Sequence, residues 1–137
     1  TEGNVGGTVG AVFAEVTPTA PNGSIYPTIL DLGNNRSPLS QWTSSLSLQT
    51  YDGTTLCSNS TPMASGSVNK VAATWGAQGL ANYVNGNQST AAFDGDMDVG
   101  ATMTIGNHGG ADYGFGGPIR NLKIYPVALT TAQVAKL

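Results

Sequence analysis

Three carboxylates stand at alternate positions in the segment FDGDMDVG, namely Asp94, Asp96 and Asp98. Alternating carboxylates can give a hard cation such as Ca²⁺ several oxygen ligands. The segment lacks the later glycine and the bidentate glutamate of an EF-hand, so a solvated acidic loop is the simpler interpretation. Glycoside hydrolysis needs two carboxyls across a substrate cleft, and no second acidic cluster accompanies these three. We therefore keep them only as candidate metal ligands.

The chain has one histidine, His108, and one cysteine, Cys57. No G-x-S-x-G segment supplies a nucleophilic serine, and chance proximity explains a Cys57–His108 pair better than catalysis does. The segment GNHGGADYGFGG around His108 lacks the Lys-Ser/Thr and the following helix of a phosphate loop. A lone cysteine forms no intramolecular disulfide and has no metal-site spacing. We expect no catalytic residue and no cofactor, and expect Cys57 to be a small buried side chain.

Aromatic and planar polar side chains are the residues that could bind a ligand. Carbohydrate recognition uses flat aromatic faces against the C–H face of a sugar ring, with amide or carboxylate groups for its hydroxyls. The candidate contacts lie in a connection (Arg36, Trp42), at a hairpin (Tyr51, Asp52), on the polar face of a strand (Tyr83) and in the glycine-rich segment (Asn107, His108, Asp112, Tyr113). Trp42 and Tyr113 fit ligand contact and simple packing about equally, and the others also fit a solvated surface.

Charge is sparse in this chain of 137 residues, with 9% charged residues, 39% hydrophobic residues and a formal net charge of −3. The surface must therefore be neutral and rich in hydroxyl and amide groups. Such a chain has no basic patch for phosphates or anionic lipid, so we expect neither nucleic-acid binding nor membrane insertion. The first residue is Thr1 rather than methionine. This favours a fragment or processed product of a longer chain.

The segment 69–86, NKVAATWGAQGLANYVNG, predicts the strand pair around which the other elements are arranged. Val71, Ala73 and Trp75 alternate with Lys70, Ala72 and Thr74, so a period of two places the first three in a core. The chain reverses at 76–79. The pair Asn85-Gly86 tolerates the positive φ of a type I′ turn into a strand at 87–92, which completes a β-meander.

Further strands are expected at 6–16, 28–32, 46–51, 54–58, 101–106 and 119–125, with Asp52-Gly53 as a second type I′ turn and 36–43 as a connection. Thr130 and Gln133 have capping-box spacing, and Leu129 and Val134 have the spacing of a hydrophobic staple, which predicts a short helix at 131–137. Many short strands without intervening helices predict one all-β domain over 1–137, an antiparallel two-sheet sandwich with a C-terminal helix.

Three segments carry a family resemblance: KVAATWGAQGLANYVNG, TIGN and FGGPIRNLKIYPVALTTAQVAKL. Their order and spacing resemble the laminin G-like, concanavalin A-like jelly roll. GPIRNLKIYP and the early Phe13-Ala14-Glu15 are more closely similar to the version at the C-terminal end of bacteriophage tail fibres and tailspikes. The calcium-binding members have an acidic residue in the closing strand where this chain has Arg120-Asn121, so the resemblance does not imply a structural calcium.

The resemblance implies a lectin-like recognition domain on the virion tail surface. Its expected partners are a bacterial surface polysaccharide, the rest of the parent fibre chain and further copies in a homotrimer. A domain that caps or trimerises the fibre without binding glycan is an alternative, which an apolar patch with Ile119 and Tyr125 would favour. A third is the carbohydrate-binding module of a secreted bacterial hydrolase or lyase.

Overall fold

The computed structural model describes residues 6–19, 27–34, 36–42, 45–107 and 113–137, with only the backbone described at Trp42. Five strands form sheet A: β1 (Gly10–Val16), β6 (Asn69–Gly76), β7 (Gly79–Val84), β8 (Asn87–Ala91) and β10 (Ile119–Tyr125), in the order β10-β1-β6-β7-β8. Five others form sheet B: β2 (Thr28–Asp31), β3 (Ser37–Trp42), β4 (Ser47–Tyr51), β5 (Leu56–Pro62) and β9 (Thr104–Ile105), in the order β5-β4-β3-β2-β9.

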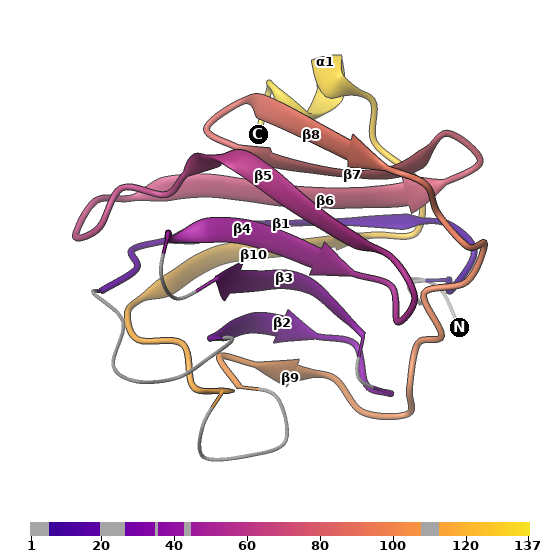
Figure 1. Ribbon diagram of the computed structural model, residues 1–137, viewed down its shortest axis with the longest axis horizontal. Helices are drawn as coiled ribbons and strands as arrows, with labels where there is room; N and C mark the ends of the chain where they lie inside the picture. The colour runs from indigo at the N-terminus through magenta and orange to yellow at the C-terminus, as the bar shows by residue number, and fades with distance from the viewer. Residues whose placement is uncertain (1–5, 20–26, 35, 43–44, 108–112) are drawn as a thin grey trace.

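The two sheets lie face to face, with sheet B in front of β1 and β10 in Figure 1. The strand pairs within both sheets are antiparallel. The predicted all-β antiparallel sandwich with a short C-terminal helix is confirmed. Among the described residues, no helix is long and apolar enough to span a membrane.

The core between the sheets follows the predicted alternation in β6. Val71, Ala73 and Trp75 are fully buried and belong to one apolar cluster. That cluster also contains Cys57, at 2% exposure, which confirms the expected small buried side chain. Trp75 has a second role, because its Nε1–H donates to Gly6 O at 3.1 Å and fixes the N-terminal segment.

The turn between β7 and β8 is predicted correctly. Asn85 and Gly86 have φ values of 50° and 87°, as a type I′ turn requires. The turn between β4 and β5 is different. Asp52 N donates to Thr55 O at 3.2 Å across a longer loop, and of the pair Asp52-Gly53 only the glycine has a positive φ, 101°. The expectation of a type I′ turn there is therefore wrong.

The expected connection at 36–43 is also wrong, because Ser37–Trp42 forms β3 inside sheet B. Pro38 has no N–H to give to a neighbouring strand, which makes the segment resemble a break. The sheet accommodates this proline with a register shift against β4 between Ser37 and Ser40. Leu39 is nevertheless fully buried.

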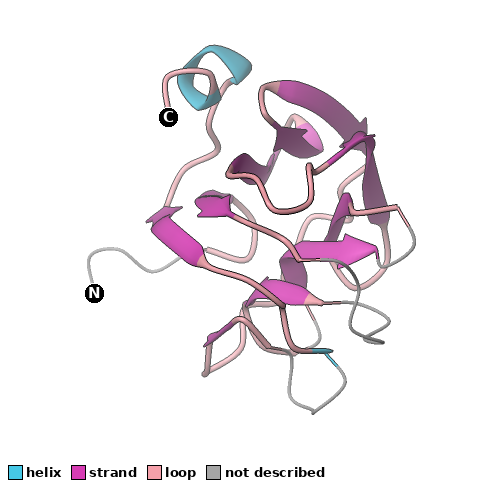
Figure 2. Cartoon of the chain, turned by 90° about the vertical axis from the view of Figure 1, so that its left-hand side faces the viewer, coloured by secondary structure: helices cyan, strands magenta, loops and turns pink. Residues whose placement is uncertain are grey.

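The helix α1 (Thr131–Val134) begins with the predicted capping box. Thr130 N donates to Gln133 Oε1 at 2.8 Å, and Gln133 N donates to Thr130 Oγ1 at 3.3 Å. The helix packs on the outer face of sheet A. In Figure 2 it lies outside the two layers of strands. There Val134 belongs to a second apolar cluster, the cluster under α1, with Phe13, Ala72, Ala81 and Tyr83, and the half-buried Tyr125, Leu129 and Leu137 pack against it.

Removing the cap should loosen this docking. We expect Thr130→Ala to lower the free energy of unfolding by about 1 kcal/mol, because the N–H of Gln133 loses its side-chain acceptor. Thr130→Ser retains the hydroxyl and should stay near the wild-type value. Chemical denaturation measures both variants, and equal stabilities for the two would show that the cap contributes nothing.

Candidate functional site

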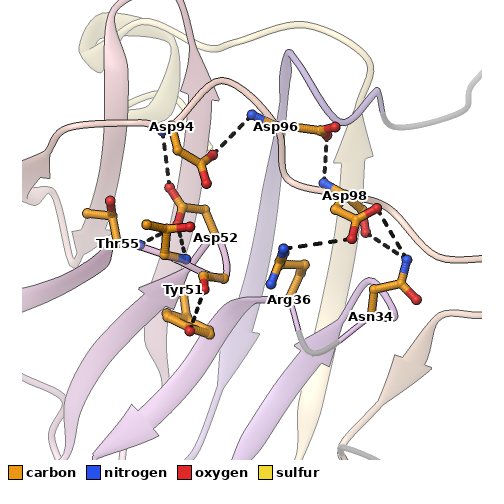
Figure 3. A network of polar contacts seen from close by, with 10 residues as sticks. Asn34, Arg36, Tyr51, Asp52, Thr55, Asp94, Asp96 and Asp98 are labelled. Carbon is orange, nitrogen blue, oxygen red and sulfur yellow. Dashed lines mark hydrogen bonds and ion pairs between the residues drawn. The ribbon is translucent and has the colours of Figure 1, made fainter.

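Three connections meet at one end of the sandwich: 32–36 between β2 and β3, 52–55 between β4 and β5, and 92–103 between β8 and β9. One backbone hydrogen bond and one contact from a backbone N–H to a side chain tie them together. Gly100 N donates to Leu32 O at 2.7 Å, and Asp94 N approaches Asp52 Oδ2 at 3.5 Å. Polar side chains of all three connections therefore gather at this end (Figure 3).

Residues 94–98, the acidic loop, have a repeating local structure. Asp96 N donates to Asp94 Oδ1 at 3.1 Å, and Asp98 N donates to Asp96 Oδ1 at 2.7 Å. Between them Met97 is fully buried, and its N–H donates to Gly7 O at 2.7 Å. The carboxylates thus satisfy backbone donors in succession, while the intervening methionine anchors the loop to the core.

This arrangement bears on the three candidate metal ligands. Asp94, Asp96 and Asp98 are exposed, and two of them use a carboxylate oxygen within the loop. In the described parts of the chain, no group of three His, Cys, Asp or Glu side chains could hold a metal ion. Each carboxylate has a local role that does not need a cation.

The pKa of the Asp94 carboxyl is lower than its ordinary value of 3.8, chiefly because it accepts the N–H of Asp96, with the Thr54 hydroxyl and the Arg36 charge adding to the effect. A carboxyl with a lowered native pKa stabilises the folded state above its unfolded pKa, and this stabilisation is lost as the pH falls through the native pKa. We therefore expect Asp94 to titrate below pH 3.8 in an NMR titration of the native protein. Asp94→Asn should reduce the acid-induced loss of stability in that range, and a titration midpoint above 3.8 would contradict this account.

Asn34, Arg36 and Asp98 form what we call the polar rim, next to the acidic loop. Asn34 Nδ2 donates to Asp98 O at 3.4 Å and to Asp98 Oδ1 at 3.3 Å. Arg36 Nη2 lies 3.7 Å from Asp98 Oδ2, which is an ion pair but too long for a hydrogen bond. Arg36 Nε is buried and has no hydrogen-bond partner among the described residues. The 3.7 Å separation therefore leaves Arg36 Nη2 and Asp98 Oδ2 without a hydrogen bond to each other.

Gly53 explains how Arg36 fits here. A Cβ atom at this position would overlap the guanidinium group of Arg36, and the φ of 101° also favours glycine. The hairpin between β4 and β5 thus supports the arginine through its backbone. The predicted candidate Arg36 is brought into a polar cluster, whereas Asn34 was missed, although the Gly33-Asn34-Asn35 turn signal stands in the sequence.

The other two candidates at this end are structural. Asp52 is fully buried, and its Oδ1 accepts from Thr54 N at 2.9 Å and Thr55 N at 2.6 Å. The Tyr51 hydroxyl donates to Gly53 O at 2.6 Å. The expectation of an accessible carboxylate at Asp52 is wrong, because that group caps its own turn. Tyr51 folds back on the hairpin and stays half-buried.

The prediction that Tyr83 lies on a solvent-facing polar face is also wrong, because α1 covers the outer face of β7. The tyrosine is 3% exposed within the cluster under α1. Its hydroxyl lies 3.2 Å from Thr131 Oγ1 and accepts from Gln88 Nε2 at 3.0 Å. A C-terminal helix that docks by its apolar side covers a position which strand alternation alone predicts to face solvent.

The remaining candidates lie toward the opposite end of sheet B. Trp42 pairs with Ser47 at the end of β3 remote from Ser37 and Arg36. Asn107 and Tyr113 are exposed, Tyr113 at 36%. The side chain of Trp42 and all of His108 and Asp112 lie outside the described residues. The predicted set is therefore divided between two ends of the sandwich.

Solved structures share this architecture. A candidate carbohydrate-binding protein from Bacteroides ovatus is 17% identical with a TM-score of 0.78, covering 97% of this chain and 41% of its own. A heptameric SAP-like pentraxin from Limulus polyphemus is 20% identical with a TM-score of 0.68, covering 98% and 71%. A Trypanosoma rangeli sialidase bound to sialic acid is 16% identical with a TM-score of 0.65, covering 92% and 22%. At these low sequence identities, the similarity shows a shared fold and nothing more.

No curated protein matches the chain closely enough to count as a relative. The chain spans less than half of the Bacteroides protein and under a quarter of the sialidase. A family model described as the concanavalin A-like lectin/glucanases superfamily matches residues 5–135. Because that match includes all ten strands and α1, the chain belongs to the concanavalin A-like lectin/glucanase superfamily.

Proposed function

We propose that this chain is a noncatalytic recognition domain that binds a bacterial surface polysaccharide through the polar rim. The observation that carries the proposal is the grouping of an amide, a guanidinium and a carboxylate at the loop end of a lectin-like sandwich. Such planar groups donate to and accept from sugar hydroxyls with defined geometry.

The spacing within the rim suits a hydroxyl ligand. Arg36 Nη2 and Asp98 Oδ2 are 3.7 Å apart, so neither group satisfies the other by a hydrogen bond. A sugar hydroxyl can accept from the guanidinium and donate to the carboxylate at the same time. Asn34 already orients the Asp98 carboxylate, which reduces the entropy lost on binding.

Charge at this end restricts the ligand. The exposed carboxylates of Asp94, Asp96 and Asp98 lie at the same end as the guanidinium of Arg36 (Figure 3). An acidic sugar would meet like charges, whereas a neutral or amino sugar would not. We therefore propose a neutral or amine-bearing glycan as the preferred ligand.

For the parent protein, we propose a bacteriophage tail fibre or tailspike exposed on the virion tail, in which three copies act together. The support is the sequence similarity of GPIRNLKIYP and Phe13-Ala14-Glu15 to the C-terminal domains of such proteins. Two of the similar solved chains are much longer than this domain, which covers 41% and 22% of them, and this fits one domain of a longer chain. A carbohydrate-binding module of a secreted hydrolase or lyase fits the domain comparably, and weak sites can gain from multivalency in both settings.

An apolar patch with Ile119 and Tyr125 would favour the alternative of a glycan-free capping or trimerisation domain. Both are half-buried in the structure, Ile119 against the inter-sheet core and Tyr125 against the cluster under α1. Light scattering tests trimer formation directly. A monomer at high protein concentration would argue against the capping or trimerisation domain and would leave the recognition proposal unaffected.

Binding of fluorescent protein to an array of bacterial polysaccharides tests the proposed function. We expect binding to neutral or amine-bearing glycans that falls about tenfold for Arg36→Ala and severalfold for Asp98→Asn, because each variant removes a charge-assisted hydrogen bond. Arg120→Ala, at an exposed position of β10, is the matched control and should bind like wild type. Absence of binding with the protein displayed multivalently would reject recognition, and unchanged binding by Arg36→Ala would reject the polar rim.

A further inference from the structure

Two adjoining hollows lie on the sheet A side of the acidic loop. One, of about 590 Å³, is bounded by the turn between β6 and β7 and by residues 91–95. The other, of about 330 Å³, is bounded by the same turn, by the outer face of β7 and β8 and by residues 128–132. Both are lined by Gly76, Gln78 and Gly79, so we treat them as one surface, the turn groove. Each volume lies in the range of roughly 300–1,000 Å³ that small-ligand sites have.

The turn groove differs from the polar rim in its chemistry. Not one of the described residues that line it carries a charge. Its polar members are threonine, glutamine and tyrosine side chains, and small residues such as Gly76, Gly79 and Ala92 keep it open. Uncharged hydroxyl and amide groups match neutral sugar hydroxyls without the desolvation cost of an ion.

The polar groups of the turn groove are partly fixed and partly available. Gln88, Tyr83 and Thr131 bond one another, since Gln88 Nε2 donates to Tyr83 Oη at 3.0 Å and Thr131 Oγ1 donates to Gln88 Oε1 at 3.4 Å. In contrast, the exposed side chains of Gln78 and Thr90 make no hydrogen bond within the described structure. The turn groove thus combines a hydrogen-bonded group, Tyr83, Gln88 and Thr131, with two side chains, Gln78 and Thr90, that can donate to and accept from a ligand.

We propose that the turn groove binds uncharged oligosaccharide units and extends the polar rim into a longer binding surface. This inference rests on the proposed carbohydrate recognition. The acidic loop separates the two parts, because Gly95 lines the groove while its neighbours Asp94 and Asp96 present carboxylates. A neutral chain can cross this loop from rim to groove, whereas an anionic chain is repelled there.

Calorimetry with oligosaccharides prepared from the polysaccharide that binds best on the array tests this inference. We expect about a threefold to tenfold loss of affinity for Gln78→Ala and for Thr90→Ala, as for one net hydrogen bond each. Ala92→Trp fills the groove and should reduce affinity by more than tenfold, whereas Ala64→Trp, at an exposed position at the opposite end of β5, should leave it unchanged. Thermal denaturation of each variant checks folding.

The outcomes separate this inference from the proposed function. If wild type binds and Arg36→Ala weakens binding while the Gln78, Thr90 and Ala92 variants bind normally, the groove is rejected and recognition stands. If the glycans that bind best on the array are acidic and affinity falls steeply with salt concentration, the proposal of an uncharged ligand in the turn groove is rejected. If wild type binds no polysaccharide, recognition itself fails, and the groove fails with it.

Discussion

Replacing Asn82 by leucine should lower the free energy of unfolding by about 3 kcal/mol, although the change makes the core more apolar. Asn82 is fully buried in β7, and its Nδ2 donates to Cys57 O at 2.9 Å and Thr50 Oγ1 at 3.3 Å across to sheet B. Its Oδ1 accepts from Asn59 Nδ2 at 3.1 Å. Leucine would leave buried groups of sheet B without these partners, which costs more than the added apolar area stabilises.

Urea denaturation measures the effect of Asn82→Leu. The matched control is Gln78→Ala, which removes an exposed amide and should change stability by less than about 0.5 kcal/mol. Asn59→Leu should resemble Asn82→Leu, and the double variant should cost less than the sum of the two because the partners share one network. A stability of Asn82→Leu equal to wild type would show that the inter-sheet amides contribute no net stability.

Trp75→Ala is expected to have the largest effect, a loss of about 3–5 kcal/mol in the free energy of unfolding. The indole is fully buried between the sheets, and alanine would leave a large cavity there. The indole N–H also holds Gly6, and the adjacent Gly7 accepts from Met97 in the acidic loop. Trp75 therefore connects the core to the segment that positions the candidate site.

A second variant separates packing from this connection. Trp75→Phe keeps most of the apolar volume but lacks the donor to Gly6, so it should cost less than Trp75→Ala and still speed hydrogen exchange at Met97 N–H. Denaturant titration and exchange by NMR report the two effects. Unchanged exchange at Met97 in Trp75→Phe would mean that the acidic loop does not depend on this hydrogen bond.

The sequence was sufficient for the fold wherever the signal was local. Alternation at Val71, Ala73 and Trp75, the Asn85-Gly86 turn and the capping box at Thr130 each follow from residues within a few positions of one another. β3 was missed because Pro38 normally marks a break, and only its neighbours in sheet B show how a register shift accommodates it. The buried amides of Asn59 and Asn82 carry no local signal at all.

The candidate site was harder to predict, since a polar side chain beside a turn can face solvent or cap the turn. Arg36, a ligand contact predicted from its residue type, lies in a polar cluster, but its partners Asn34 and Asp98 come from separate loops that only the tertiary structure joins. Asp52 and Tyr83 have residue types that suit ligands, yet one caps a backbone turn and the other lies under α1. Burial of these two side chains depends on long-range contacts.

Recognition at the polar rim is tested most directly by following backbone amide shifts while an oligosaccharide of the array-selected polysaccharide is added to the isotopically labelled protein. We expect the shifts to concentrate at Asn34, Arg36 and residues 94–98, with further changes around Gln78. Shifts confined to the far end of sheet B, near Asn107 and Tyr113, would contradict the rim, and an unchanged spectrum at saturating ligand would contradict recognition altogether.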